Sequence, residues 1–91
     1  MRARDIRWSD AKDALLRLDK TRGYKGLAEC AAAIESGKIL EDGPHPNRLN
    51  QRIFVIEIEG YAYVVPYVIE GDYVFLKTMF PSRKYTAEYL K

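Results

Sequence analysis

Three short apolar segments follow one another in the second half of the chain, at residues 53–58, 61–68 and 73–79. Only Glu59-Gly60 separates the first two, and Glu70-Gly71-Asp72 separates the second from the third. Short segments rich in β-branched and aromatic residues, joined by such turns, are typical of an antiparallel meander. The pattern therefore predicts three consecutive antiparallel strands.

Helical periodicity dominates the first half of the chain. Residues 10–18 predict an amphipathic helix that Ser9 or Asp10 caps, with a buried stripe of Ala11, Ala14, Leu15 and Leu18. Residues 27–36 predict a second helix that ends at Gly37. A short strand at 38–40 and a loop at 42–50 come next, and Ser82 is expected to cap a final helix that runs to about Leu90.

These elements predict a single α+β domain over residues 1–91. We expect two N-terminal helices packed on a four-stranded, mostly antiparallel sheet, followed by a short C-terminal helix. Alternate side chains of a strand point to opposite faces, so aliphatic residues share one face and tyrosines the other. We expect the helices to cover the aliphatic face and the tyrosine face to look outward. Pro66 has no N–H to donate, so it predicts a bulge or a locally unpaired edge.

Composition narrows the class of protein. With 47% hydrophobic and 12% aromatic residues, a folded globule is expected rather than disorder. No apolar segment could span a bilayer, no export signal is found, and Cys30 is the single cysteine, so we expect a cytoplasmic protein without a disulfide. Cys30 is interpreted as a small buried hydrophobe, with a reactive thiol as the alternative. No Cys/His spacing predicts a metal site, and no cofactor is expected.

The distribution of charge along the chain indicates an anionic partner. The net charge is only +2, but residues 1–25 carry eight Lys or Arg and residues 77–91 carry four. Tyrosines and cations on one face of a sheet suit single-stranded RNA, since bases stack on rings and cations contact phosphates. Solvated rim packing is the alternative. The candidate contacts on the strands are Tyr61, Tyr63, Tyr67 and Lys77.

Two further segments could carry chemistry. His45, the only histidine, lies in a proline-flanked loop beside Arg48, and it could move a proton to or from a ribose 2′-OH. Arg83, Lys84 and Tyr85 follow Ser82 at a predicted helix start, where fixed cations would stabilise a developing phosphorane. A solvent-facing loop and ordinary solvated cations are the alternatives.

The order of these motifs resembles a known family. Trp8-Ser9-Asp10-Ala11-Lys12 followed by Arg22-Gly23, and the closing Pro81-Ser82-Arg83-Lys84, are similar to segments of BrnT-type toxins. The resemblance covers nearly the whole chain. It implies a RelE-like fold, cleavage of mRNA without a metal, and a cognate antitoxin, often a ribbon-helix-helix DNA-binding protein. DNA would then be contacted only through that antitoxin, and no membrane is involved.

The resemblance also implies catalytic residues. The basic site of the family maps by position to Arg52, Lys77 and Arg83, together with His45. The leading hypothesis is thus a type II toxin that acts as an endoribonuclease through 2′-OH attack. The alternative is a non-catalytic module that binds RNA or a protein through the Tyr/Lys face, and a purely structural subunit is a third interpretation.

Overall fold

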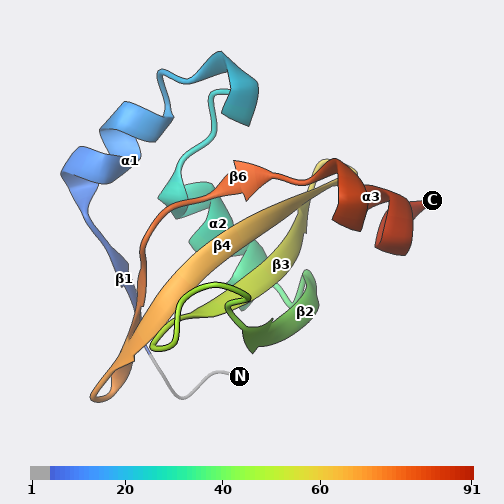
Figure 1. The fold of residues 1–91 in the computed structure, drawn as a ribbon. Helices are drawn as coiled ribbons and strands as arrows, with labels where there is room; N and C mark the ends of the chain where they lie inside the picture. The colour runs from blue at the N-terminus through green and yellow to red at the C-terminus, as the bar shows by residue number, and fades with distance from the viewer. Residues whose placement is uncertain (1–4) are drawn as a thin grey trace.

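A computed structural model describes residues 5–91 as an α+β fold with three α-helices and a mostly antiparallel sheet (Figure 1). The predicted helices and meander are present, with boundaries shifted by a few residues. In chain order the elements are β1 (Asp5–Trp8), α1 (Asp10–Leu16), the 3₁₀ turn η1 (Lys20–Arg22), α2 (Leu27–Glu35), β2 (Ile39–Pro44), β3 (Arg52–Ile58), β4 (Tyr61–Glu70), β5 (Tyr73–Leu76), β6 (Phe80–Pro81) and α3 (Arg83–Leu90).

Within residues 5–91 the sheet has six strands, not the four expected, in the order β1-β5-β4-β3-β2, while β6 pairs with β4. The core β2–β5 is antiparallel throughout. β1 adds a parallel edge, with Asp5 opposite Tyr73 and Trp8 opposite Leu76. The sequence pattern missed β6 because two residues are too few to show strand periodicity. It missed β1 because two of its four residues are charged, so the segment contains no apolar run.

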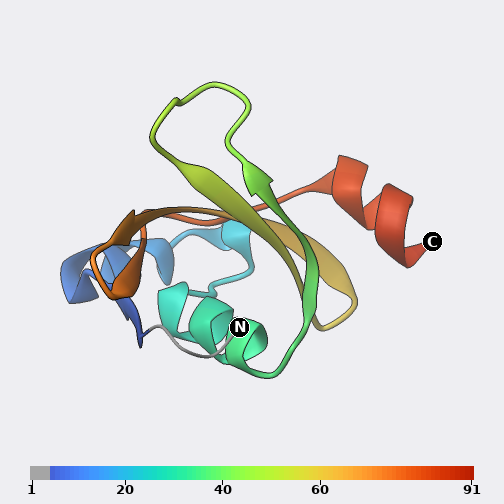
Figure 2. The same cartoon turned by 90° about the horizontal axis from the view of Figure 1, so that it is seen from below.

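The two sides of the sheet differ. We call the side carrying Tyr63, Val65 and Tyr67 the α2 face, and the side carrying Val64 and Pro66 the α3 face. The main core lies between the α2 face and α2, whereas α3 covers a smaller cluster of Ile53, Val55, Ala62 and Val64. Figure 2 shows α2 on one side of the sheet, and the loop between β2 and β3 reaching out on the other.

The expectation that the tyrosine face of β4 looks outward is wrong. Tyr63 and Tyr67 are 7% and 3% exposed, and Tyr61 is half-buried against the same core. The Tyr67 ring stacks on Phe54, with centroids 4.1 Å apart. Large rings are needed to fill the space under α2, whose inward residues include the small Cys30, and so the α2 face takes the aromatics.

The buried stripe predicted for the first helix is also wrong. α1 ends at Leu16, which is its one buried residue, while Leu15 and Leu18 are 66% and 77% exposed. The polar face of α1 contacts α2 instead, since Asp13 accepts hydrogen bonds from the backbone N–H groups of Leu27 and Ala28.

Across residues 5–91 no helix has the length and apolar character needed to cross a membrane.

Pro66 breaks the sheet on one side only. The β3–β4 register runs without a shift past Pro66, which lies opposite Ile53, so the bulge is absent. On its other side β4 pairs with β6 up to Val64 and with β5 from Tyr67 onward, which leaves an interruption at Pro66. The expected interruption of the edge is therefore present, and the chain between β5 and β6 passes there.

Candidate nucleic-acid interface

The loop of residues 45–51 carries His45 and joins β2 to β3. A backbone hydrogen bond of 3.0 Å from the His45 N–H to the Gln51 carbonyl closes the base of this loop. Pro44 and Pro46 fix the backbone torsion on either side of His45. The half-buried imidazole is thereby held at the edge of the α3 face.

The segment of residues 77–80 faces the loop of residues 45–51 across a cavity. The Lys77 N–H donates to the Pro66 carbonyl at 2.8 Å, which anchors the start of the segment beside the interruption in β4. Arg22 of η1 donates through Nε to the Met79 carbonyl at 2.6 Å and forms an ion pair with Asp19. Residues far apart in sequence thus fix the backbone that carries Lys77.

A cavity of about 370 Å³ opens between these two segments and α1, and we call it the basic cavity. Its charged side chains are all cationic: Lys12 comes from α1, Arg48 from the loop and Lys77 from the segment after β5. No Asp or Glu is among its lining residues in the described part of the chain. The lining comprises Lys12, His45, Arg48, Gln51, Pro66, Lys77, Thr78 and Phe80.

A second cavity of about 250 Å³ adjoins the first, and we call it the apolar cavity. The two cavities share His45 and Phe80. Ile53 and Val64 of the small core, and Tyr85 packed against it, form part of its wall. The lining comprises His45, Pro46, Asn47, Ile53, Val64, Phe80, Ser82, Lys84 and Tyr85.

Three cation–aromatic pairs also lie on the α3 face. Their distances from cation to ring centroid are 4.2 Å for Arg7 over Tyr73, 5.7 Å for Lys77 over Phe75 and 5.3 Å for Lys84 over Tyr85. The strand register places Tyr73 and Phe75 on the side of Val68, which is the α3 face. Cations thus lie beside aromatic rings at three places on this side of the molecule, a combination also used by proteins that bind single-stranded nucleic acid.

The hydrogen bond to the His45 ring defines what that ring can do. The backbone N–H of Asn47 donates to Nδ1 at 3.0 Å, so the proton of the neutral imidazole lies on Nε2. In this arrangement Nε2–H can donate a hydrogen bond to a phosphate oxygen. With Nδ1 accepting the bond from Asn47, the ring offers Nε2–H as a hydrogen-bond donor and has no free acceptor nitrogen in this arrangement.

Arg52 and Tyr67 do not join this site, because they lie on the α2 face. Arg52 Nε donates to the Tyr67 hydroxyl at 3.0 Å, and that hydroxyl donates to Asp42 at 2.6 Å. Burial, followed by the hydrogen bond to Asp42, raises the pKa of Tyr67 to about 12. The cation expected to contact phosphate is thus paired with a carboxylate, and Tyr61 and Tyr63 lie on the same covered face.

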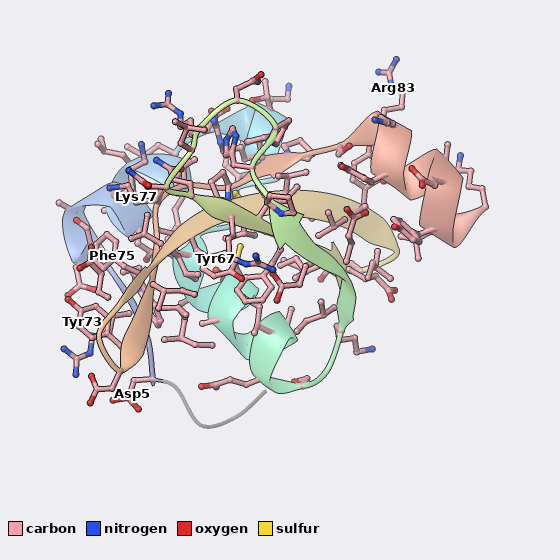
Figure 3. The ribbon with its side chains drawn as sticks, turned by 60° about the horizontal axis from the view of Figure 1, so that its bottom comes forward. Asp5, Tyr67, Tyr73, Phe75, Lys77 and Arg83 are labelled. Carbon is pink, nitrogen blue, oxygen red and sulfur yellow. The ribbon has the colours of Figure 1, made fainter. Side chains whose placement is uncertain are left out.

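Arg83 and Lys84, the two cations at the start of α3, lie in different surroundings. Lys84 and Tyr85 line the apolar cavity, whereas Arg83 lines neither cavity. Figure 3 shows Arg83 pointing outward at the start of α3, across the molecule from Lys77 beside α1. The Ser82 cap is as expected, since its hydroxyl accepts from the Tyr85 N–H at 3.1 Å.

The structure therefore gathers His45, Arg48 and Lys77, with Lys84 and Tyr85 alongside, and separates them from Arg52, Arg83 and the β4 tyrosines. Sequence reasoning missed Lys12 and Phe80 as site residues. Lys12 had a signal in the Trp8-to-Lys12 motif that resembles the toxins, whereas nothing singled out Phe80.

Within residues 5–91, no three His, Cys, Asp or Glu side chains group so that they could hold a metal ion.

Comparison with known proteins identifies no relative of this chain. No family model, no curated protein and no solved structure matches the chain.

Proposed function

We propose that the chain binds single-stranded RNA across the α3 face and cleaves it without a metal, as the toxin of a toxin–antitoxin pair in the cytoplasm. The observation that carries the RNA-binding part is the basic cavity. Lys12, Arg48 and Lys77 come from three separate segments and meet there with His45, and none of the described residues that line the wall is acidic. Such a cluster of cations favours an anionic ligand, and the rings beside it favour a nucleic acid strand.

The reaction that suits these residues needs no covalent enzyme intermediate. The ribose 2′ oxygen forms a bond to phosphorus while the bond to the 5′ oxygen breaks, giving a 2′,3′-cyclic phosphate and a 5′-hydroxyl. The 2′ proton leaves to water and the 5′ oxygen takes one from water. The phosphorane carries more negative charge than the bound substrate, so Lys12, Arg48 and Lys77 would stabilise it preferentially. His45 would donate its Nε2–H to a phosphate oxygen.

The test is cleavage of a labelled RNA by purified protein in excess chelator. We expect products that end in a 2′,3′-cyclic phosphate, and no cleavage of the same strand with 2′-deoxyribose. Lys77→Ala should slow cleavage strongly, and His45→Ala, which removes a hydrogen-bond donor to the phosphorane, should slow it on the order of 100-fold. RNA that is bound but stays intact over the whole assay would contradict a ribonuclease.

A second candidate function is RNA binding without cleavage. The bond from the Asn47 N–H to His45 Nδ1 favours it, because it leaves the ring no free acceptor nitrogen in this arrangement. The chelator experiment separates the two, since a binding module would retain RNA affinity and give no cyclic phosphate.

The toxin part of the proposal rests on the resemblance to BrnT-type proteins, which also implies a RelE-like fold. The α+β fold with its mostly antiparallel sheet supports this part. A cognate antitoxin would then silence the protein by covering the α3 face. Expression alone should arrest growth, and expression together with the product of the neighbouring gene should not. Normal growth at a high level of folded protein would count against a toxin but not against RNA binding.

A further inference from the structure

We propose that the apolar cavity is a subsite for one nucleobase of the RNA, next to a phosphate held in the basic cavity. This inference rests on the proposed function and adds to it a second contact of different chemistry. It explains why two cavities adjoin on the α3 face, one lined by cations and the other largely by rings and aliphatic groups.

The lining and volume of the apolar cavity suit a single aromatic ring. Ile53 and Val64, both buried, belong to the small core beneath it, and Phe80 and Tyr85 supply aromatic surface. Phe80 is 39% exposed although it is large and apolar, so its ring has surface left for a ligand. The volume of about 250 Å³ is slightly below the roughly 300 Å³ at which pockets for larger ligands begin, which fits one base.

The edge of the apolar cavity is polar in the way that a base and its sugar require. The Asn47 side chain offers a donor and an acceptor, and Lys84 offers a cation near the Tyr85 ring. Most of the wall lacks hydrogen-bonding groups. We therefore expect stacking strength, more than hydrogen bonding, to set the base preference of this subsite.

The shared residues connect the two cavities. His45 and Phe80 line both, so a ligand that fills both cavities would contact the imidazole and the phenyl ring. In a nucleic acid strand a base and the neighbouring phosphate are joined through one ribose, which places them side by side. A free phosphate would fill only the basic cavity, and an apolar peptide side chain would fill only the other.

The experiment compares two short oligomers of equal length and charge. One is a 2′-fluoro adenosine oligomer, which cannot be cleaved through a 2′-OH, and the other carries no bases. Dye-labelled strands are titrated with the protein, and anisotropy gives the affinities. We expect the base-bearing strand to bind on the order of 10-fold more tightly, because stacking on a protein ring contributes about that factor per base or more.

Variants of Phe80 locate the effect. Phe80→Leu should weaken binding of the base-bearing strand several-fold and leave the base-free strand unchanged, and Phe80→Trp should restore the wild-type affinity. The matched control is Tyr24→Leu, since Tyr24 is an aromatic residue that is 59% exposed and lines neither cavity. Melting curves check that all three variants are folded.

The outcomes distinguish the subsite from the function on which it rests. Equal affinity for both strands, with no effect of Phe80→Leu, would overturn the base subsite and leave RNA binding through the phosphates intact. A loss with Tyr24→Leu as large as with Phe80→Leu would also overturn it. No binding of either strand would refute the proposed function together with the subsite.

Discussion

The two faces of the sheet use the same residue types for opposite purposes. On the α2 face the aromatic rings are buried, the cation Arg52 is paired with Asp42, and the Tyr67 hydroxyl joins the two. On the α3 face Phe80 is partly exposed, and the charged side chains that line the basic cavity within residues 5–91 are all cationic. Tyrosines and cations near one another therefore do not by themselves define a binding surface.

The two faces differ because the helices cover them to different extents. α2 lies over the α2 face and forms the main core with it. On the other side α3 packs on a small cluster, and the basic cavity lies beyond it, between α1, the loop of residues 45–51 and the segment of residues 77–80. Residues on the α2 face should therefore control stability, and residues on the α3 face should control ligand affinity.

The largest expected effect is a stability change from the α2 face. Tyr67→Ala should lower the free energy of unfolding by about 3–5 kcal/mol, because it removes a buried ring stacked on Phe54 and leaves Asp42 without its hydroxyl donor. Phe80→Ala, an aromatic truncation on the α3 face, should cost less than about 1 kcal/mol. Urea unfolding measures both. Equal losses would mean that the faces do not differ as described.

Alkaline pH should weaken the same face. The folded-state pKa of Tyr67 is raised from 10.0 to about 12, so its stabilising contribution is complete below pH 10 and is lost as the pH rises toward 12. Wild type should lose about 2 kcal/mol more than Tyr67→Phe over this range, because the variant has no phenol to ionise. Parallel pH profiles of the two proteins would show that Tyr67 is not protected by burial.

Two arginines provide a matched test of ligand affinity. Arg48→Gln should weaken RNA binding on the order of 10-fold and make the slope of log affinity against log salt shallower by about 0.7, the loss of one phosphate contact on a single strand. Arg52→Gln should leave affinity and slope unchanged, because that cation already pairs with Asp42. The measurement is RNA affinity at several salt concentrations for each variant and for wild type. A stronger effect from Arg52→Gln would place the RNA on the α2 face.

The smallest expected effect concerns two neighbours in α3. Lys84→Ala should weaken RNA binding a few-fold, since Lys84 lines the apolar cavity, and Arg83→Ala should change it less. The two variants remove one positive charge each at nearly the same place, so long-range electrostatic effects cancel in the comparison. If the two variants lose equal affinity, α3 contributes only general positive potential.

The sequence was informative wherever a local signal decides the structure. Ser82 predicted the start of α3, Gly37 the end of α2, and Pro66 an interruption of the strand edge. The orientation of β4 was not available in this way, because both of its faces are apolar and either could have met α2. Residues 10–18 misled for a related reason, since periodicity shows an apolar stripe but not whether a partner covers it.

The candidate site could be predicted only in part. Lys77 and His45 were identified because each is unusual in its segment. Arg52 and Arg83 looked equivalent to Arg48 and Lys84 by composition, and only the fold separates them, since Asp42 pairs with Arg52 and α3 turns Arg83 away. Phe80 acquires a role only when β6 pairs with β4 and brings it beside Val64.

The most direct test of which face holds the RNA is an NMR titration of backbone amides with a non-cleavable 2′-fluoro oligomer. The account predicts that the largest shifts occur in residues 45–51, in residues 77–80 and at the start of α3, with little change in α2 and β2. Shifts concentrated on α2, or around Asp42 and Arg52, would contradict it.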